Sequence, residues 1–373
     1  MSSELSLGAL SSAAEPPARR SIAQRLEIAP ATEALMVELQ LLAKDEVLTS
    51  LPSGRPETYL YDLLPEYPVR GGKGLRPMLC LATSMAYGGS EHEALPFAVA
   101  LELMHNAFLV HDDIQDGSLL RRGCPTLHVR HGTPLALNAG DALILMSTSM
   151  LSDAVRSIPA NLAAAVLANW DCAMTQTLEG QALDLGWQRD GRTDVTFHDY
   201  LLMAGKKTAW YTTVLPMAMG AIVGSGRVAA GAASFRFAWL LGLLFQVAND
   251  LAGLDAEPGE GDIEEGKRTI LIVHLFRALQ GSDRDELTRL MGLPREARNV
   301  DEVAWVRARM IDQGSEGFAR GCLASLAGAA LHEADVAFGD LSDSIARDAL
   351  FAIVPHLLDP TGNVAARFAA QPI

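Results

Sequence analysis

The amino-acid sequence predicts an all-α fold, in which roughly a dozen helices form a single bundle. Alanine- and leucine-rich segments from about residue 28 onward repeat apolar side chains at the spacing of an α-helix. No segment combines strict alternation with enrichment in β-branched residues, so no strand is predicted. Short breaks rich in glycine, proline or aspartate divide the helical segments; they lie at residues 71–72, 88–89, 123–125, 190–193, 224–226 and 258–261.

Composition divides the chain into three parts. Residues 1–24 are rich in Ser, Ala, Pro and Glu without an apolar period, and we predict that they are disordered. Residues 25–360 are predicted to form one helical domain, because a chain of 373 residues can fill one large core. Residues 361–373 follow as a loosely specified C-terminal tail.

The charge balance restricts the class of protein. A net charge of −15 argues against a nucleic-acid-binding protein, which needs a basic face for phosphates. Phosphorylated substrates remain possible, because metal ions can bridge them to acidic side chains. The most apolar stretch, residues 235–253, is interrupted by polar side chains such as Arg236 and Asp250, so no membrane span is expected.

The cysteines indicate a reducing compartment. The four residues Cys80, Cys124, Cys172 and Cys322 lie far apart and form no CxxC motif, and the N-terminus shows no secretory signal pattern. We predict reduced thiols in a cytoplasmic protein.

The most informative segment runs from Leu101 to Asp116 and reads LELMHNAFLVHDDIQD. Asp112 and Asp116 are four residues apart, so both carboxylates project from one helix face. Asp113 lies about 100° away around the helix and is expected either to assist them or to hold a group beside the metal site. Two like charges on an apolar helix require a cation, and oxygen ligands suit Mg²⁺. A solvated acidic helix end is the alternative for this motif taken alone.

Basic residues flank the aspartates in a pattern suited to diphosphates. His105 lies two turns before Asp112, and the pair Arg121-Arg122 follows in RRGCPTLH. Guanidinium groups match phosphate oxygens, so paired arginines beside a metal site can hold two diphosphates. Upstream, the segment GGKGLRP places Lys73 and Arg76 three residues apart after a flexible turn.

The segments GGKGLRP, HDDIQD and RRGCPTLH occur in the order and spacing of the trans-prenyl diphosphate synthase family, which includes geranylgeranyl and farnesyl diphosphate synthases. Further similarity lies in GQALDL at 180–185, KTA at 207–209, FQ at 245–246 and D…GKRT at 262–269. The resemblance covers roughly residues 45–275. It implies an isoprenoid synthase-type bundle with a central active-site cavity and a homodimer. It also implies Mg²⁺ as cofactor, and isopentenyl diphosphate and an allylic diphosphate as substrates.

The resemblance also assigns roles to individual residues. Those expected to hold isopentenyl diphosphate are Lys73, Arg76, His105 and Arg122, with Gln246 beside them. Those expected to grip the allylic diphosphate are Arg121, Lys207 and Lys267. Those expected to bind magnesium are Asp112 and Asp116, with Asp113 assisting, while Gln181 and Asp184 form a polar wall. In catalysis Lys207 and Lys267 share the charge of the departing diphosphate, and Thr208 and Gln246 direct oxygen dipoles toward the carbocation. Lys207 could alternatively be a surface lysine beside Lys206.

The second aspartate motif departs from the family pattern. The family usually has DDxxD after Phe-Gln, whereas this chain has Asn249-Asp250-Leu251-Ala252-Gly253. Asn249 can coordinate through its amide oxygen but carries no charge, and Gly253 offers no ligand. Of three expected magnesium ions, the third should bind more weakly or recruit Asp250, Asp255 or Asp262. A Gly253→Asp change could then tighten binding, unless the glycine meets a backbone requirement.

Two other functions fit parts of the sequence. Asn249, Gly253 and Glu257 resemble the NDxx(S/T/G)xxxE motif of class I terpene cyclases, which ionise an allylic diphosphate without isopentenyl diphosphate. A cyclase does not need the second diphosphate site that Lys73 and Arg76 provide, so chain elongation is favoured. The third interpretation, a non-catalytic regulatory subunit of a synthase, is disfavoured by the intact first motif.

Residues before Asp112 should control product length. Phe108 is four residues upstream, Ala107 five, and Met104 and Leu103 lie a turn deeper, where they could form the floor. In the family, bulky side chains at the first two positions stop growth early. Small Ala107 with bulky Phe108 predicts a C20 product, geranylgeranyl diphosphate, with C15 next. The alternative is that these are ordinary core residues.

Overall fold

A computed structural model describes residues 28–228, 231–255 and 261–358. The predicted disorder of residues 1–24 and the tail at residues 361–373 lie outside these ranges. The same is true of most of the break predicted at residues 258–261.

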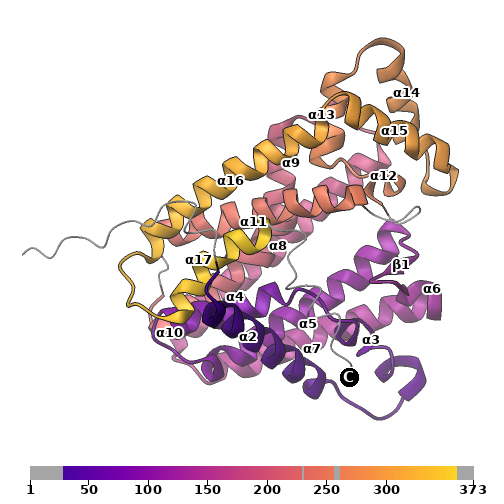
Figure 1. The fold of residues 1–373 in the computed structure, drawn as a ribbon. Helices are drawn as coiled ribbons and strands as arrows, with labels where there is room; N and C mark the ends of the chain where they lie inside the picture. The colour runs from indigo at the N-terminus through magenta and orange to yellow at the C-terminus, as the bar shows by residue number, and fades with distance from the viewer. Residues whose placement is uncertain (1–27, 229–230, 256–260, 359–373) are drawn as a thin grey trace, which may run out of the picture.

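The predicted all-α architecture is confirmed (Figure 1). The N-terminal half contains α2 (Pro30–Ser50), η1 (Glu57–Tyr61), α3 (Glu66–Val69), α4 (Leu75–Ala86), α5 (Glu91–Asp116), β1 (Leu120–Arg121), β2 (Cys124–Pro125), α6 (Leu127–His131), α7 (Thr133–Arg156) and α8 (Ala160–Arg189). The C-terminal half contains α9 (Phe197–Ala204), η2 (Gly205–Val214), α10 (Leu215–Ser225), α11 (Ala232–Ala252), η3 (Gly253–Asp255), α12 (Asp262–Glu265), α13 (Ile270–Ala278), α14 (Gly281–Met291), η4 (Arg295–Ala297), α15 (Val300–Asp312), α16 (Ser315–Phe338) and α17 (Ile345–Leu358).

Helix α5 carries the first aspartate motif through the core. It starts at a capping box, in which Ser90 Oγ accepts from the Glu93 amide and Glu93 Oε2 accepts from the Ser90 amide at 2.9 Å. It ends at Gly117, whose φ of 64° allows the left-handed conformation of a helix C-terminus. Between these ends α5 packs on α4 and α7. The motif therefore sits on the last turn of a long, buried helix.

A short hairpin follows α5, at a place where the sequence predicted only a break. Leu120 pairs with Pro125 and Arg121 with Cys124 in antiparallel register. The two residues between the strands, Arg122 and Gly123, have φ values of 57° and 72°. Two-residue hairpin turns favour positive φ, which glycine adopts freely and arginine rarely. The hairpin thereby fixes the direction of both paired arginines.

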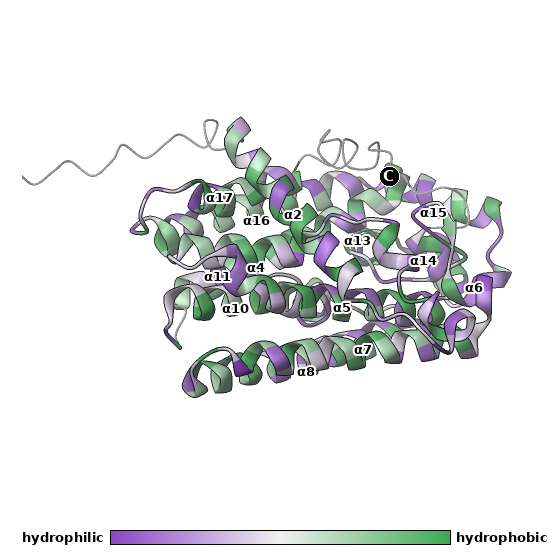
Figure 2. Ribbon diagram, turned by 90° about the horizontal axis from the view of Figure 1, so that it is seen from below, coloured by the Kyte–Doolittle hydropathy of each residue, from purple (hydrophilic) through white to green (hydrophobic). Residues whose placement is uncertain are grey.

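Among the residues that the structure describes, two helices are long and apolar enough to cross a membrane by length and composition. Neither of them is the stretch that the sequence singled out. In α5, 61% of the apolar window is buried inside the bundle. In α7 only 33% of it is buried, and Leu137 and Leu145 are exposed. Figure 2 shows α7 and α8 along one face of the molecule, with α16 and α17 on the opposite side. Helix α7 thus presents apolar side chains on an outer face.

Glycines allow η2, a π-helical segment, to lie against its neighbours α8 and α11. A Cβ atom at Gly180 of α8 would lie 2.1 Å from the amide nitrogen of Lys207. On the other side, a Cβ at Gly242 of α11 would lie 2.4 Å from Ala209 Cα. Because only hydrogen fits at these two positions, glycine sets how close the backbone of η2 comes. This contact positions Lys207 and Thr208.

We predict that Gly180→Ala lowers the free energy of unfolding by about 1–3 kcal/mol, because the methyl group meets backbone atoms that cannot rotate away. Gly186→Ala is the matched control on the same helix, since a Cβ there meets nothing within 4 Å. The control should raise stability by roughly 0.5–1 kcal/mol through helix propensity. Urea denaturation measures both changes, and equal effects would contradict the close approach of η2.

Candidate active site

Two carboxylates at the end of α5 are paired with lysines from distant parts of the chain. Lys207 Nζ lies 3.6 Å from Asp112 Oδ1 and 2.6 Å from Asp184 Oδ2. Lys267 Nζ lies 2.7 Å from Asp116 Oδ2. The pairs of like charges expected on α5 are therefore compensated by cations from η2 and from the segment after α12.

Hydrogen bonds show where the predicted polar wall lies and which of the two adjacent lysines faces the aspartates. Gln181 Nε2 donates to Asp112 Oδ1 at 3.1 Å, so the predicted wall does border the aspartates. Lys206 Nζ donates to Gln176 Oε1 at 2.8 Å, on the outer side of α8. Because Lys206 takes the outer position, Lys207 is the inner lysine and the surface alternative for it is excluded.

Burial and charge oppose each other at the two aspartates. Burial disfavours ionisation of Asp112, but the positive charges of two lysines and Arg121 outweigh it and lower its pKa. At Asp116 burial dominates and raises the pKa to about 6, although Lys267 opposes the rise. Burial also disfavours the charge on Lys207 and Lys267, yet the surrounding carboxylates raise the pKa of both. The site therefore holds its charges as mutually dependent ion pairs.

The donor set fits magnesium only together with a substrate. Carboxylate oxygens of Asp112 and Asp116 are suitable ligands for Mg²⁺. Within the described ranges, however, no group of three His, Cys, Asp or Glu side chains is arranged to hold a metal alone. Mg²⁺ commonly completes its coordination with substrate phosphates and water. A magnesium ion carried by a diphosphate would replace the lysine contacts of the two aspartates.

Asp113 takes one of the two roles expected for it, that of holding a group beside the metal site. Its carboxylate is fully buried, accepts from Arg121 Nε at 2.7 Å, and accepts the hydroxyl of Tyr67. Because protein donors bind both oxygens in this structure, its role as a metal ligand stays a prediction. Asp113 orients Arg121, whose Nη2 lies 3.8 Å from Asp112 Oδ2.

The residues assigned to isopentenyl diphosphate gather around His105. Burial, together with the positive charges of Arg76 and Arg122, holds the pKa of His105 well below its usual range. The ring is therefore neutral at pH 7, and none of the described residues bonds its buried Nδ1 atom. The Arg122 guanidinium lies against Gly72, where a Cβ would be 2.6 Å from Nη2. Arg122 thus reaches the loop that carries Lys73.

Aromatic and hydroxyl groups hold the remaining two cations. Arg76 Nη2 donates to Tyr211 Oη at 2.7 Å and to Thr212 Oγ1 at 2.8 Å, and its Cζ lies 4.4 Å from the Tyr211 ring centroid. Lys73 Nζ lies 5.3 Å from the Phe245 ring centroid. The Lys73 ammonium therefore comes from the loop before α4 and the Arg76 guanidinium from the first turn of α4.

A chain of hydrogen bonds joins η2 to the second motif. Thr208 Oγ1 donates to Gln246 Oε1 at 2.5 Å, and Gln246 Nε2 donates to Asp250 Oδ1 at 2.7 Å. Asp250 Oδ2 accepts from Tyr200 Oη at 2.8 Å and from the Ile270 amide at 2.9 Å. These three donors show that Asp250 positions Gln246 in this structure, and its expected metal role stays a prediction. Asn249 precedes it and is half-buried.

The gap left by Gly253 in the second motif is filled by another acid. Gly253 has a φ of −63°, so no left-handed conformation requires a glycine there. A Cβ at this position would instead lie 2.6 Å from Asp262 Oδ2. The Asp262 carboxylate thus occupies the space that a side chain at position 253 would need, and burial raises the pKa of Asp262 to about 7. A side chain at position 253 would therefore have to displace the Asp262 carboxylate.

The predicted chain-length residues separate onto two faces of α5. Phe108 lies edge-on to Tyr211 with ring centroids 5.4 Å apart, and Met104 belongs to the same main core. Ala107 and Leu103 belong to a second apolar cluster shared with α7. Phe108 and Met104 therefore lie on the side of α5 that faces Tyr211 and the main core, while Ala107 packs toward α7.

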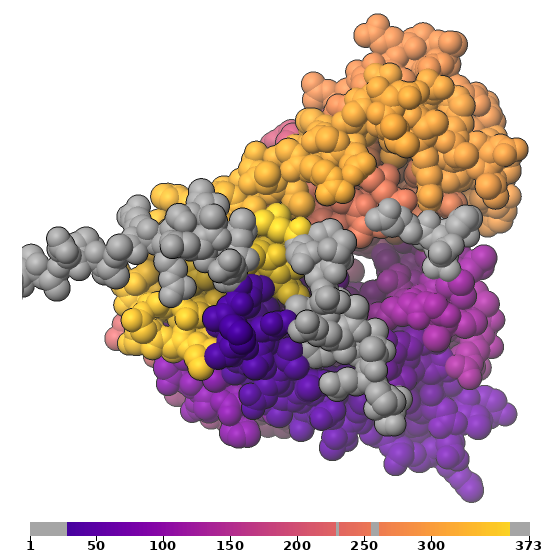
Figure 3. Space-filling view, in the orientation of Figure 1, coloured from indigo at the N-terminus to yellow at the C-terminus, as the bar shows by residue number. Residues whose placement is uncertain are grey.

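Charged side chains span the cleft between α5 and the α12–α15 region. Glu265 Oε1 accepts from Ser118 Oγ at 2.8 Å and from Arg295 Nη1 at 3.0 Å. Arg295 Nη1 also donates to the carbonyl oxygen of Asp116 at 3.3 Å. Figure 3 shows a gap in the surface here, between the magenta part around β1 and the orange parts. These contacts connect two regions on either side of the cleft.

Sequence reasoning missed several residues of this site, namely Glu102, Tyr67, Tyr211, Glu265 and Arg295. Glu102 lies three residues before His105, and this helical spacing could have indicated it. Its Oε2 atom is buried without a bond from any described residue; burial raises its pKa, and Arg76 and Arg122 lower it. Tyr67 and Arg295 lie far along the chain and carry no local signal.

Comparison with known proteins identifies the family. Residues 57–310 match the model of the family described as polyprenyl synthetase. The chain belongs to the polyprenyl synthetase family. This family of enzymes depends on magnesium.

Named relatives support a prenyltransferase. The short chain isoprenyl diphosphate synthase of Methanothermobacter thermautotrophicus is 34% identical over 258 residues, covering 67% of this chain and 77% of that protein. The geranylgeranyl diphosphate synthase of Saccharolobus solfataricus is 32% identical over 237 residues, covering 62% and 70%. The crystal structure of geranylgeranyl pyrophosphate synthetase from Pyrococcus horikoshii Ot3 has a TM-score of 0.75 at 28% identity, covering 88% and 98%. This polyprenyl synthetase is accordingly a prenyltransferase, and neither the cyclase nor the regulatory alternative is favoured.

We predict that Gly253→Asp weakens the binding of inorganic diphosphate with Mg²⁺, reversing the expectation from sequence. The new carboxylate would compete with Asp262 for one space, and like charges in contact repel. Isothermal titration calorimetry should show a loss of about tenfold. The exchange variant Gly253→Asp/Asp262→Gly should recover most of the affinity, whereas tighter binding by the single variant would contradict the steric explanation.

Proposed function

We propose that this polyprenyl synthetase condenses isopentenyl diphosphate head-to-tail with an allylic diphosphate and releases geranylgeranyl diphosphate (C20). The observation that carries the proposal is the division of charge at the site. One cluster, at Arg76, Arg122 and neutral His105, is basic and suits a diphosphate held directly by protein cations. The other, at Asp112 and Asp116, suits a diphosphate that arrives with magnesium. A cyclase that acts on a single diphosphate substrate does not need both clusters.

In this proposal the allylic substrate loses its diphosphate first. Magnesium ions held by Asp112 and Asp116 would neutralise charge on the departing diphosphate. Lys207 and Lys267, released from their carboxylate partners, would donate hydrogen bonds to the same phosphate oxygens. Arg121 would add a third cation, held in place by Asp113. The allylic C–O bond breaks, and its electron pair leaves with the diphosphate.

The second substrate is positioned by the basic cluster. Arg76, Arg122, Lys73 and neutral His105 would hold the isopentenyl diphosphate so that its double bond faces the carbocation. The π electrons form the new carbon–carbon bond, and a proton then leaves to the diphosphate already present. Oxygen dipoles of Thr208 and Gln246 would face the positive carbon.

Product length follows from the floor of the site. Phe108 lies edge-on to Tyr211, four residues before Asp112, and would stop the growing chain at an intermediate length. Relatives named geranylgeranyl diphosphate synthase support the C20 product. Small Ala107 packs toward α7 and leaves Phe108 as the principal barrier.

We also propose a homodimer in the cytoplasm. Exposed leucines of α7, at 46% for Leu137 and 68% for Leu145, form an apolar face that a second copy would cover. The four cysteines are free, in keeping with a reducing compartment.

The test of the proposal is an elongation assay. Purified protein is incubated with Mg²⁺ and dimethylallyl, geranyl or farnesyl diphosphate, with and without isopentenyl diphosphate, and products are analysed by mass spectrometry. We expect longer prenyl diphosphates, ending at C20, only when isopentenyl diphosphate is present. Asp112→Ala should abolish turnover even at saturating magnesium. Hydrocarbons or alcohols formed without isopentenyl diphosphate would instead indicate a cyclase.

We predict that Arg76→Ala raises the KM for isopentenyl diphosphate by about ten- to a hundredfold, the effect of one lost charge-assisted hydrogen bond. The KM for the allylic substrate should change by less than about threefold. Lys207→Ala is the matched variant and should show the converse, because Lys207 belongs to the other cluster. Equal effects of Arg76→Ala on both substrates would contradict the assignment of the two sites.

We predict that Phe108→Ala extends the product beyond C20, because removal of the ring opens the floor beside Tyr211. Reversed-phase chromatography of the dephosphorylated products measures the chain length. Leu103→Ala is the control in the other apolar cluster: it should cost about 2–5 kcal/mol of stability without lengthening the product. A Phe108→Ala enzyme that still stops at C20 would show that another residue forms the barrier.

A further inference from the structure

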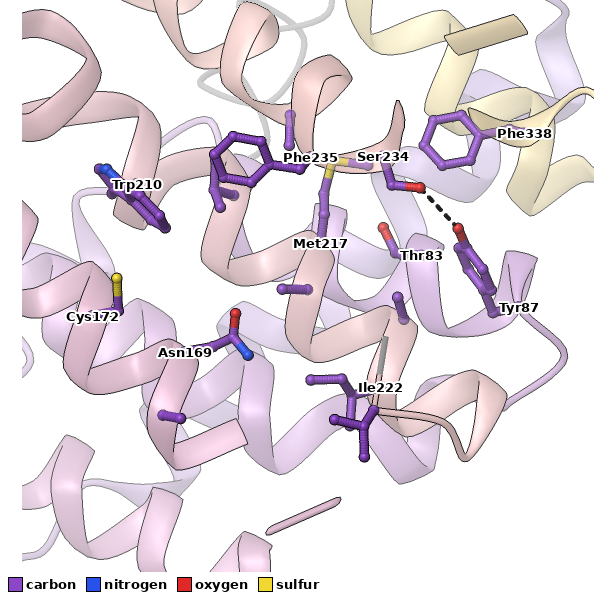
Figure 4. A pocket seen from close by; sticks show the side chains of 16 residues that line it. Thr83, Tyr87, Asn169, Cys172, Trp210, Met217, Ile222, Ser234, Phe235 and Phe338 are labelled. Atoms are coloured by element: carbon purple, nitrogen blue, oxygen red, sulfur yellow. Dashed lines mark hydrogen bonds between the residues drawn. The ribbon is translucent and has the colours of Figure 1, made fainter. Parts of the chain in front are cut away.

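A cavity of about 410 Å³ lies between α4, α8, η2, α10 and α11. Figure 4 shows its walls: Cys172 and Asn169 on one side, Thr83 and Tyr87 on the other, with Met217 between them. The volume is within the range of small-molecule sites in proteins. Nothing in the reaction proposed above uses this space.

The cavity is separate from the reaction site. Its lining residues include none from α5, the helix that carries the aspartates and the chain-length residues. Cys172 lies nine residues before Gln181 on α8, which places it about 180° around that helix. On η2 the cavity is lined by Trp210, whereas Tyr211 faces Arg76 in the basic cluster. A chain growing beneath Phe108 would therefore follow a different path.

The lining excludes a charged ligand. None of the residues that form the cavity is Asp, Glu, Lys or Arg, so a diphosphate would find no countercharge there. Most of the wall is apolar, as at Met217, Ile222 and Phe338. Trp210 and Phe235, with ring centroids 5.7 Å apart, add flat aromatic surface, and Phe235 is 42% exposed at the outer side.

One polar atom in the wall lacks a partner. Thr83 is only 1% exposed, and no described residue bonds its Oγ1 atom. A buried hydroxyl without a hydrogen bond is unfavourable, so a ligand that bonds it would be stabilised. Asn169 Nδ2 is used by the Ala165 carbonyl at 2.8 Å, and its side-chain oxygen points toward the cavity (Figure 4). Tyr87 and Ser234 bond each other at 3.1 Å and need no ligand.

We propose that this cavity binds an uncharged, largely apolar molecule that carries one hydroxyl group. The apolar body would lie against Met217, Ile222 and Phe338. The hydroxyl would bond Thr83 Oγ1 and the Asn169 side-chain oxygen. This inference does not depend on the proposed product, because it rests on residues outside the reaction site.

The probe is farnesol, an uncharged isoprenoid alcohol, added to the full chain and followed by isothermal titration calorimetry. Farnesyl diphosphate and Mg²⁺ are present at saturation, without isopentenyl diphosphate, so that the reaction site is filled. We expect one molecule of farnesol to bind under these conditions. Loss of farnesol binding when farnesyl diphosphate is added would mean that the alcohol enters the reaction site, and would overturn the proposal.

A matched pair of variants locates the site. Ala168 is exposed on α8 and lines the cavity, so Ala168→Phe should block farnesol binding. Ala164 is exposed one turn earlier on the same helix and does not line it, so Ala164→Phe should bind like the parent protein. Equal binding by both variants, or equal loss in both, would overturn the assignment.

Thr83→Val is a second test that keeps the shape of the wall. We expect it to weaken farnesol binding about three- to tenfold, the contribution of one hydrogen bond. The melting temperature of the free protein should stay the same or rise, because the unpaired hydroxyl is removed. Farnesol binding that is unchanged in Thr83→Val would contradict the proposed hydroxyl contact. The comparison of Thr83→Val with the parent protein still tests the proposal if Ala168→Phe fails to fold.

Discussion

The reaction site depends on ion pairs between the end of α5 and two lysines that are distant in sequence. Asp112 and Asp116 are largely removed from water, where an ionised carboxylate is costly without a nearby cation. Lys207 and Lys267 supply that cation and are themselves kept charged by the carboxylates. The same four groups can exchange partners when a metal-bound diphosphate enters. The charges of the site are thus balanced before the substrate arrives and, in our proposal, rebalanced by it.

In our proposal the bundle separates two diphosphates that would otherwise repel each other. His105 and Asp112 are seven residues apart on α5, which is about 10 Å along the helix axis. The basic cluster lies at His105 and the carboxylates at Asp112, so each diphosphate would have its own kind of countercharge. Neutral His105 can contribute a hydrogen bond between the arginines without adding to their mutual repulsion. Glu102, buried beside the same arginines, reduces that repulsion further.

Close packing explains why two positions near the reaction site carry glycine, which offers no side chain for binding. Because Gly180 has no side chain, η2 can approach α8 closely, and this approach brings Lys207 to the aspartates. Gly253 stands where the family usually has an aspartate, yet the carboxylate of Asp262 fills its space. In both cases the function of the glycine is to admit another residue. A substitution that restores a side chain would therefore displace a neighbour.

The sequence by itself determined the helical class, several of the breaks between helices, and the face of α5 that carries Asp112 and Asp116, because helical periodicity is a local property. Resemblance to a family supplied the identity of the lysines. Only the tertiary structure decided that Asp113 and Asp250 are held by protein donors. The Tyr67 partner of Asp113 is 46 residues away in sequence and the Tyr200 partner of Asp250 is 50. Spacing along one helix fixes the direction of a side chain, whereas the group that meets it depends on how distant helices pack.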